Sequence, residues 1–275
     1  MLTHKRTLTI AGSDSGGGAG IQADLKTFSA LGCYGMSVIT ALTAQNTVGV
    51  TGIHPVPAEF VALQLDAVMS DIGADAVKIG MLNNAEVIKS VAAGLVRHKA
   101  SNVVLDPVMT AKSGDKLLQD SAIAALKTEL LPLAFIVTPN IPEAELLTGT
   151  AIKNRQDMAE AAEALLGMGP DAVLLKGGHL EGEESPDLLA LSAGKRRWLE
   201  GRRVNTKNTY GTGCMLSSAI AAFLAHGENP EEAVLQAKEY ISGAIAAAAF
   251  YTIGKGHGPV HHFHKLWREK AQVGD

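Results

Sequence analysis

The sequence predicts an α/β protein in which a mostly parallel central sheet is covered by helices on both faces. Short β-branched runs alternate with helical patterns along most of the 275 residues, and this alternation requires right-handed crossovers between parallel strands. Apolar residues make up 47% of the chain and charged residues 19%, which allows a substantial core. Aromatic residues are only 4%, whereas glycines number 29, so close packing of helices on the sheet is favoured over an aromatic-rich surface.

The elements follow one another in a regular order. Residues 21–31 place Ile21, Leu25 and Phe28 on one face, as an amphipathic helix requires. Strands are expected at 8–10, 37–42, 76–79, 102–105, 135–138 and 172–175, and helices at 21–31, 57–72, 85–98, 121–131, 142–147 and 156–166. A hairpin of 188–191 and 195–199, with Gly194 in its turn, precedes two long helices around 214–226 and 230–250. We find no repeat or linker, so residues 1–275 are expected to form a single domain.

Charge and cysteine content narrow the class of protein. The net charge of −4 argues against an electrostatic nucleic-acid binder. Cys33 and Cys214 form no disulfide framework and suit a reducing cytosol. The apolar run after residues 4–6 is too short for a signal peptide, and the longest apolar stretch, 244–250, is too short to span a membrane. We therefore expect a soluble cytoplasmic protein with neither a nucleic-acid nor a membrane partner.

The most informative segment is residues 208–214, Asn-Thr-Tyr-Gly-Thr-Gly-Cys, which runs into a helix of small residues. Consecutive N–H groups at a helix start, unblocked by side chains, form an anion site. Gly211, Thr212 and Gly213 would build this cradle, and the helix dipole is expected to lower the pKa of Cys214. A cradle beside a potential base is what phosphoryl transfer to a hydroxyl requires. The alternative is a glycine-rich loop capping a core helix that carries a buried cysteine.

Polar residues stand at the ends of six predicted strands. Ligands of open α/β sheets bind beyond the carboxyl ends of the strands. Each of these residues alone could be a strand terminator or a helix cap, but their recurrence together with the glycine turn predicts one site. They are Asp14, Gln45, Lys78, Asp106, Asn140 and Lys176.

Two common nucleotide motifs are excluded. The glycines of residues 16–20 follow a strand and open a helix, but their spacing does not match Gly-x-Gly-x-x-Gly. No acidic residue ends the second strand, where a dinucleotide site needs one. The chain also lacks the Gly-x-x-x-x-Gly-Lys-Ser/Thr of a P-loop.

Several ordered blocks carry a family resemblance over nearly the whole chain. They include Leu-Thr-Ile-Ala-Gly-Ser-Asp at 8–14, Gly-Gly-Ala-Gly-Ile-Gln-Ala-Asp-Leu-Lys-Thr at 17–27, Lys-Ile-Gly-Met-Leu at 78–82, Val-Leu-Asp-Pro-Val-Met at 104–109, Thr-Pro-Asn-Ile-Pro-Glu at 138–143 and Lys-Gly-Gly-His at 176–179. On these blocks the chain resembles the bacterial hydroxymethylpyrimidine/phosphomethylpyrimidine kinases of thiamine biosynthesis, within the ribokinase-like superfamily. The resemblance implies phosphoryl transfer from ATP, with Mg²⁺, to 4-amino-5-hydroxymethyl-2-methylpyrimidine and then to its monophosphate. It also implies a homodimer.

The resemblance assigns roles at the phosphate end of the site. Cys214 matches the proposed base, where sugar-kinase relatives carry aspartate, and the N–H groups of residues 211–214 would hold the transferring group. Asn140 and Glu143 match an Asn-x-x-Glu element linked to magnesium and phosphate, although the same pair also reads as a helix capping box. Asp106 and Glu143 are expected to position Mg²⁺ indirectly, with Lys176 and Thr212 on the nucleotide phosphates.

The resemblance also assigns the ring pocket. Gln45 offers both a donor and an acceptor, which an aminopyrimidine edge needs. Lys238 corresponds to a lysine near the substrate-side phosphate. The remaining positions that the family uses for the pocket are Gly12, Ala19, Asp24, Met81 and Val108.

The loop departs from the family pattern, Asn-Thr-His-Gly-Thr-Gly-Cys-Thr, at two positions. Tyr210 replaces the histidine and is expected to point at nucleotide or solvent, and Met215 removes one hydroxyl at the helix start. The competing functions are a pyridoxal kinase of the same superfamily and a catalytically silent pyrimidine-binding protein.

Overall fold

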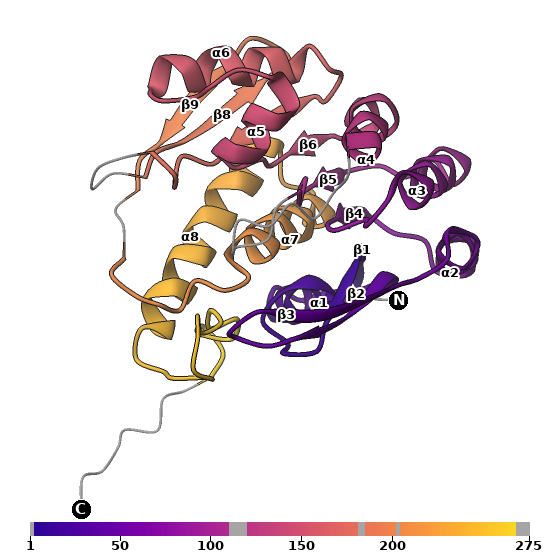
Figure 1. Ribbon diagram of the computed structural model, residues 1–275, viewed down its shortest axis with the longest axis horizontal. Coiled ribbons are helices and arrows are strands. Elements are labelled where there is room, and N and C mark those ends of the chain that lie inside the picture. Colours follow the sequence, from indigo (N-terminus) through magenta and orange to yellow (C-terminus); the bar gives the residue numbers. More distant parts are fainter. Residues whose placement is uncertain (1–2, 110–119, 181–184, 202–203, 268–275) are drawn as a thin grey trace, which may run out of the picture.

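In the computed structural model, which describes residues 3–109, 120–180, 185–201 and 204–267, a single sheet runs through the molecule (Figure 1). Its nine strands lie in the order β3-β2-β1-β4-β5-β6-β7-β8-β9. The strands are β1 Lys5–Asp14, β2 Cys33–Gln45, β3 Val50–Pro55, β4 Ala76–Ile79, β5 Val103–Leu105, β6 Ile136–Val137, β7 Ala172–Leu175, β8 Asp187–Leu191 and β9 Arg196–Leu199. All pairs from β2 to β7 are parallel, whereas β3, β8 and β9 pair antiparallel. The predicted fold class is confirmed.

Helices cover both faces of this sheet. The core on one face includes residues of α1, α7 and α8, and the core on the other includes residues of α2 to α6. Their bounds are α1 Gly20–Ala30, α2 Ala58–Asp71, α3 Ala85–Arg97, α4 Asp120–Ala125, α5 Ile141–Thr148, α6 Arg155–Leu166, α7 Thr212–His226 and α8 Pro230–Ala248. The period of two along a strand divides the cores, since Val104 joins the α7 side while Val103 and Leu105 join the other.

Two elements differ from the sequence prediction. The α-helix expected over 121–131 stops at Ala125 and continues as a π-helical turn, Leu126–Leu130, and a 3-10 turn, Leu131–Leu133. Pro132 has no N–H to donate to the turn before it, which explains the irregular end. Strand β3 was not predicted, because all six of its residues are exposed and it contains both Gly52 and Pro55, so it has no buried alternation.

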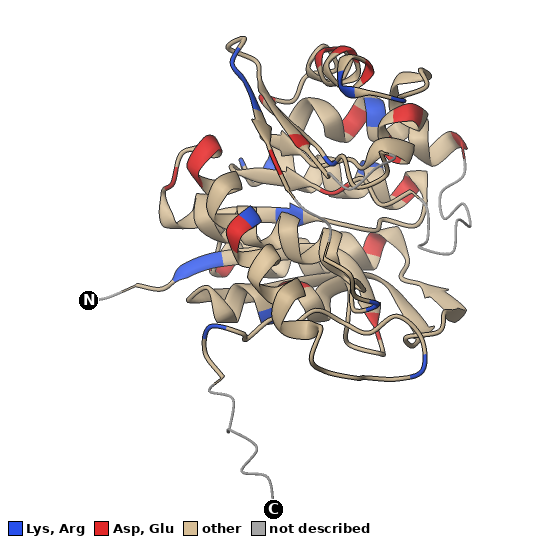
Figure 2. Cartoon of the chain, turned by 90° about the vertical axis from the view of Figure 1, so that its left-hand side faces the viewer, with Lys and Arg blue, Asp and Glu red and all other residues tan. Residues whose placement is uncertain are grey.

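Charges of both signs are spread over the ribbon in the view of Figure 2. Surface ion pairs such as Arg155 with Glu200 and Arg97 with Asp66, both 2.7 Å, join them. None of the helices in the described part of the chain is long and apolar enough to cross a membrane.

Candidate active site

The predicted anion cradle lies at the N-terminus of α7. Gly211 caps this helix with φ of +79°, and a side chain there would overlap the carbonyl oxygen of Gly18. Only glycine meets both conditions. The N–H of Met215 bonds back to the Gly211 oxygen at 2.9 Å, so the helix ladder begins there, and the earlier N–H groups lack intrahelical acceptors. The Thr212 hydroxyl donates locally to the Thr209 oxygen at 3.1 Å, which leaves its N–H for the predicted phosphate contact.

Two predicted residues from separate strand ends meet this cradle. Asp106 follows β5 and Lys176 follows β7, and Lys176 Nζ lies 3.1 Å from Asp106 Oδ1. A Cβ atom added at Gly213 would lie 3.5 Å from Asp106 Oδ2 and 3.6 Å from Lys176 Nζ. The structure therefore brings the glycine turn, the carboxylate and the ammonium to one point.

The Asn140–Glu143 pair forms the capping box of α5. The Glu143 N–H donates to Asn140 Oδ1 at 2.9 Å, and the Asn140 N–H donates to Glu143 Oε2 at 2.8 Å. Burial raises the pKa of Glu143 to about 7, against the lowering effect of Lys176. Burial would lower the pKa of Lys176, but Asp106 and Glu143 outweigh it and raise that pKa above its ordinary value. The ammonium therefore stays charged between two carboxyl groups.

The donor set suits a sparse magnesium site. Within the described ranges, no group of three or more His, Cys, Asp or Glu residues could hold a metal ion by itself. Asp106 and Glu143 both lie near Lys176, as the electrostatic effects on that lysine show. Mg²⁺ is commonly bound by one or two carboxylates, with water and substrate phosphates filling its octahedral shell. These two residues fit that pattern.

The environment of Cys214 corrects one prediction. Burial raises the pKa of its thiol to about 11, and the nearby Lys78 ammonium lowers it by less than burial raises it. The carboxylates of Asp24 and Asp106 raise it further. The expectation of a lowered thiol pKa is therefore wrong, because desolvation of the anion and the two carboxylates outweigh the groups that lower this pKa.

Asp24 was expected in the ring pocket, but its carboxylate is completely buried beneath α7. It pairs with Lys78, whose Nζ lies 2.9 and 3.0 Å from the two oxygens. Thr9 and Ser218 each donate a hydroxyl to it at 2.6 Å. Burial opposes the charge on Lys78, but Asp24 and its neighbours hold the pKa well above its usual range. The signal for this pair was the lone lysine inside the apolar run 76–79.

Three backbone N–H groups of the loop between β1 and α1 are already hydrogen-bonded to the Asp14 carboxylate. Asp14 accepts from the N–H groups of Gly16, Gly18 and Ala19 at 2.8, 2.9 and 2.8 Å. A dinucleotide-binding loop would offer such groups to phosphate. Because Asp14 accepts these N–H groups, the structure agrees with the exclusion of a dinucleotide-binding loop, which was based on the glycine spacing.

Tyr210 lies over this loop and corrects a second prediction. Its ring fills the space where a Gly18 side chain would be, and its hydroxyl donates to Asp14 Oδ2 at 2.7 Å. The hydroxyl oxygen of Tyr210 accepts from Gln45 Nε2, while Thr43 Oγ1 lies 3.0 Å from Gln45 Oε1. Tyr210 therefore points to the predicted ring residue and not to nucleotide or solvent. Burial, with Asp14 adding to it, raises the pKa of Tyr210 far above the ordinary range, so the phenol stays neutral.

The other predicted ring residues lie near the ends of β1, β4 and β5. A Cβ atom at Gly12 would come within 2.7 Å of Met81 Cε, so the absence of a side chain lets the methionine approach β1. Met81 is half-buried, and its carbonyl accepts from Thr40 Oγ1 at 2.6 Å. Val108 is also half-buried, in a turn where its N–H bonds to the Asp106 oxygen at 2.8 Å.

Lys238 is not brought to the ring residues. It forms an ion pair with Asp187, the first residue of β8, whose other oxygen accepts from the Gly177 N–H at 2.9 Å. Six strand spacings separate β2, which carries Gln45, from β8, and at about 4.8 Å each this is roughly 30 Å. Lys238 therefore belongs to the Lys176 end of the site.

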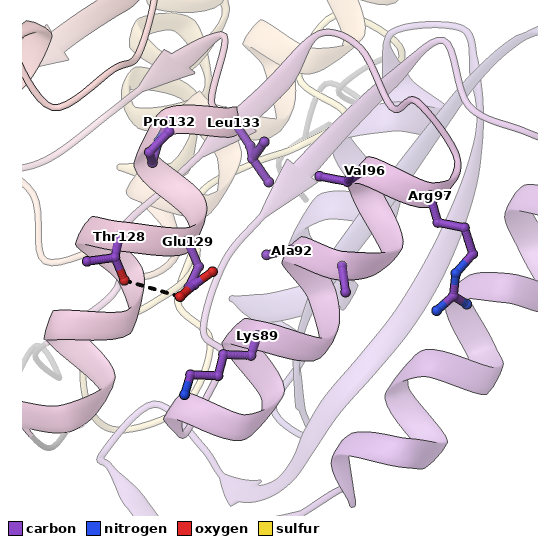
Figure 3. A pocket seen from close by; sticks show the side chains of 9 residues that line it. Lys89, Ala92, Val96, Arg97, Thr128, Glu129, Pro132 and Leu133 are labelled. Atoms are coloured by element: carbon purple, nitrogen blue, oxygen red, sulfur yellow. Dashed lines mark hydrogen bonds between the residues drawn. The ribbon is translucent and has the colours of Figure 1, made fainter.

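A hollow elsewhere on the surface contains none of the predicted residues. It lies between α3 and the turns after α4, with Lys89, Val96 and Glu129 among its lining residues (Figure 3). The Thr128 hydroxyl donates to Glu129 there at 3.4 Å. No strand end opens into it, so it plays no part in the site.

Comparisons with known proteins show which family the chain resembles. The family model for phosphomethylpyrimidine kinase matches residues 14–261. The hydroxymethylpyrimidine/phosphomethylpyrimidine kinase of Rhizobium meliloti is 57% identical over 263 residues, covering 95% of this chain and 98% of the relative. A phosphomethylpyrimidine kinase structure from Clostridium difficile has 49% identity and a TM-score of 0.78, over 88% of this chain and 99% of that one. The pyridoxal kinase of Staphylococcus aureus, in complex with AMP-PCP and pyridoxal, has 35% identity and a TM-score of 0.86, over 95% and 94%.

The fold and the helix-start site define a ribokinase-like α/β kinase. Within that class, the chain belongs to the phosphomethylpyrimidine kinase family.

Proposed function

We propose that the protein transfers the γ-phosphoryl group of MgATP to the hydroxymethyl group of 4-amino-5-hydroxymethyl-2-methylpyrimidine, and then phosphorylates the monophosphate to the pyrophosphate. Both reactions serve thiamine biosynthesis in the cytoplasm. The observation that carries the proposal is the position of Gly213, whose missing side chain leaves room within 3.5 Å of Asp106 and 3.6 Å of Lys176. A phosphoryl group there meets the helix N–H groups and a fixed ammonium.

These groups act mainly by electrostatic positioning. Charge spreads over the oxygens of the transferring group, and preorganised N–H donors and a cation stabilise it without reorganisation. Lys176 remains charged because Asp106 and Glu143 hold its pKa above the ordinary value. Bound Mg²⁺ would neutralise part of the phosphate charge, with Asp106 and Glu143 holding it through water.

Cys214 has a smaller role than the N–H cradle. In the first reaction the hydroxymethyl oxygen forms a bond to phosphorus, the bond to the ADP oxygen breaks, and the alcohol proton must leave. A thiol with a pKa of about 11 is mostly protonated at neutral pH, so only its thiolate fraction can accept that proton. In the second reaction the acceptor is already an anionic phosphate and needs little help from a base.

Gln45 is the proposed reader of the aminopyrimidine ring, with Met81 as an apolar wall close to Gly12. An amide offers donor and acceptor from one side chain. Tyr210 already holds one amide hydrogen of Gln45, and the amide retains one more N–H and one more lone pair for a ligand.

An ATP-coupled assay tests the proposed function with three acceptors: the pyrimidine alcohol, its monophosphate and pyridoxal. We expect turnover with the first two and a much smaller specificity constant for pyridoxal. Efficient phosphorylation of pyridoxal without the second pyrimidine reaction would identify a pyridoxal kinase instead. Binding of the pyrimidine with no ATP turnover would identify a silent binding protein.

We further propose a homodimer formed through β3 and α2. Apolar side chains are exposed there, with Ile53 43%, Phe60 54% and Leu63 61% accessible. Both elements contact β2, and large apolar side chains exposed on such elements are candidates for burial in a protein–protein interface. Sedimentation analysis should give a dimer for the wild type and a monomer for Ile53→Lys. An unchanged dimer would place the interface elsewhere, and a wild-type monomer would refute the proposed homodimer.

A further inference from the structure

We propose that Tyr210 is a specificity-determining positioning residue, which sets the direction in which the Gln45 amide faces the substrate ring. The inference rests on the proposed function, in which Gln45 reads an aminopyrimidine edge. It concerns a residue whose hydroxyl joins two parts of the chain 165 positions apart.

Asp14 fixes which groups donate and which accept in the hydrogen bonds around Tyr210. This carboxylate is 3% exposed and receives the N–H groups of the β1–α1 loop, with Gly18 donating at 2.9 Å. An ionised carboxylate only accepts hydrogen bonds, so the hydroxyl of Tyr210, 2.7 Å away, must donate its single proton to Asp14. The tyrosine oxygen is left with lone pairs alone for Gln45.

That constraint orients the amide. Gln45 must turn its NH₂ group toward Tyr210, which places its carbonyl oxygen near Thr43. The reversed amide would set its carbonyl oxygen against the tyrosine oxygen, with no proton between them. The two ends of an amide are distinguished by such partners, and here the partner that distinguishes them is Tyr210.

Thr43 does not fix the direction. Its hydroxyl lies 2.8 Å from the Ser13 carbonyl and 3.0 Å from Gln45, and it has one proton to give. When that proton goes to Ser13, the hydroxyl oxygen can accept from a reversed amide equally well. Removal of the Tyr210 hydroxyl alone therefore frees Gln45 to turn over.

The orientation matters because donor and acceptor order distinguishes related rings. A 4-aminopyrimidine presents the ring N3 acceptor beside an amino donor. Its 4-oxo analogue presents an N3–H donor beside a carbonyl acceptor, which is the reverse order. A fixed Gln45 matches one order and leaves unpaired groups with the other, whereas a freely turning amide accommodates both.

The experiment compares kcat/KM for 4-amino-5-hydroxymethyl-2-methylpyrimidine with that for the 4-oxo analogue. We expect the wild type to prefer the amino ring about 100-fold or more, since unpaired polar groups are strongly rejected in such sites. Tyr210→Phe keeps the ring over Gly18 and removes only the hydroxyl. It should lower this preference about tenfold or more, because the turned amide pairs with the 4-oxo ring. The KM for MgATP should stay within about twofold.

Three further single variants and one double variant separate the possible causes. Tyr34→Phe removes a half-exposed phenol hydroxyl elsewhere and should leave the preference unchanged. Thr43→Val removes the other partner of Gln45 and should also keep the preference, because Tyr210 still orients the amide. Gln45→Leu should abolish the preference, and adding Tyr210→Phe to it should change nothing more.

The outcomes distinguish this inference from the proposed function. A wild-type enzyme inactive on the pyrimidine would refute the proposed function itself. A preference lost in Gln45→Leu but intact in Tyr210→Phe overturns the positioning role and leaves the function standing. If Tyr210→Phe instead loses activity equally on both rings, with a raised KM for MgATP and a lower Tm, then Tyr210 only clamps the loop, which also overturns the inference.

Discussion

Gly213→Ala is expected to lower turnover about 100- to 1000-fold without weakening the fold. The added methyl group would lie 3.5 Å from Asp106 Oδ2 and 3.6 Å from Lys176 Nζ, which are ordinary contact distances, so no neighbour must move. Gly213 is in the first turn of α7, where alanine is the better helix former by up to about 1 kcal/mol. The thermal midpoint should therefore stay the same or rise slightly.

The same methyl group occupies the space that the proposed function gives to the transferring phosphoryl group. Loss of the contact between the phosphoryl group and one preorganised N–H donor lowers turnover roughly 100- to 1000-fold, which corresponds to about 3–4 kcal/mol in activation free energy. We expect a loss of this size in both phosphorylations, because both use the same cradle. Calorimetric binding of the pyrimidine alcohol should persist, since Gln45 belongs to another part of the site.

Gly211→Ala provides the contrasting variant two residues away. Here the backbone has φ of +79° and the new methyl group would overlap the Gly18 oxygen, so both stability and turnover should fall. Coupled-enzyme kinetics and thermal melts on the two variants make the comparison. Wild-type turnover in Gly213→Ala would show that the phosphoryl group does not pass over this glycine, and the assignment of the cradle would be refuted.

Three further predictions concern titratable groups whose charge is affected by burial. With a Cys214 thiol pKa of about 11, the first phosphorylation should speed up about tenfold per pH unit from pH 7 to 9 if the thiolate is the base. Cys214→Ala should remove this slope and slow the first step about 100-fold, far more than the second, whereas equal losses would assign the thiol to packing. Lys78→Met should cost about 3–5 kcal/mol in urea unfolding by stranding the Asp24 charge, and adding Asp24→Asn should recover part of the loss; no such recovery would contradict their coupling. Burial lowers the pKa of His262 to about 4, so the unfolded chain takes up the proton first and stability is lost as pH falls from 6.5 toward 4, by up to about 3 kcal/mol. His262→Asn should flatten that part of the curve, and an unchanged acid profile would contradict the assignment.

The sequence by itself determined the fold class and identified the residues proposed for the phosphate end of the site. Strand and helix patterns are local periods, so the parallel sheet could be predicted from residue types alone. Gly211 and Gly213 were identifiable as candidates for the proposed cradle because glycine has no side chain to block an anion from a helix start. Asp106 and Lys176 were identifiable because parallel strands deliver their carboxyl ends to one edge, and the structure brings these two side chains to 3.1 Å.

The tertiary structure alone decided the charge states and the partners. The pKa of Cys214 depends on how much water α7 excludes, which no local pattern reveals. Asp24 neutralises Lys78 because helix packing buries both side chains. Lys238 pairs with Asp187 of β8, and the strand order places β8 far from β2, which carries Gln45. Tyr210 meets Gln45 across 165 residues of chain, through a contact that exists only once the loop packs on Gly18. Desolvation and long-range hydrogen bonds arise from packing, whereas a sequence pattern records only which side chains are available to take part.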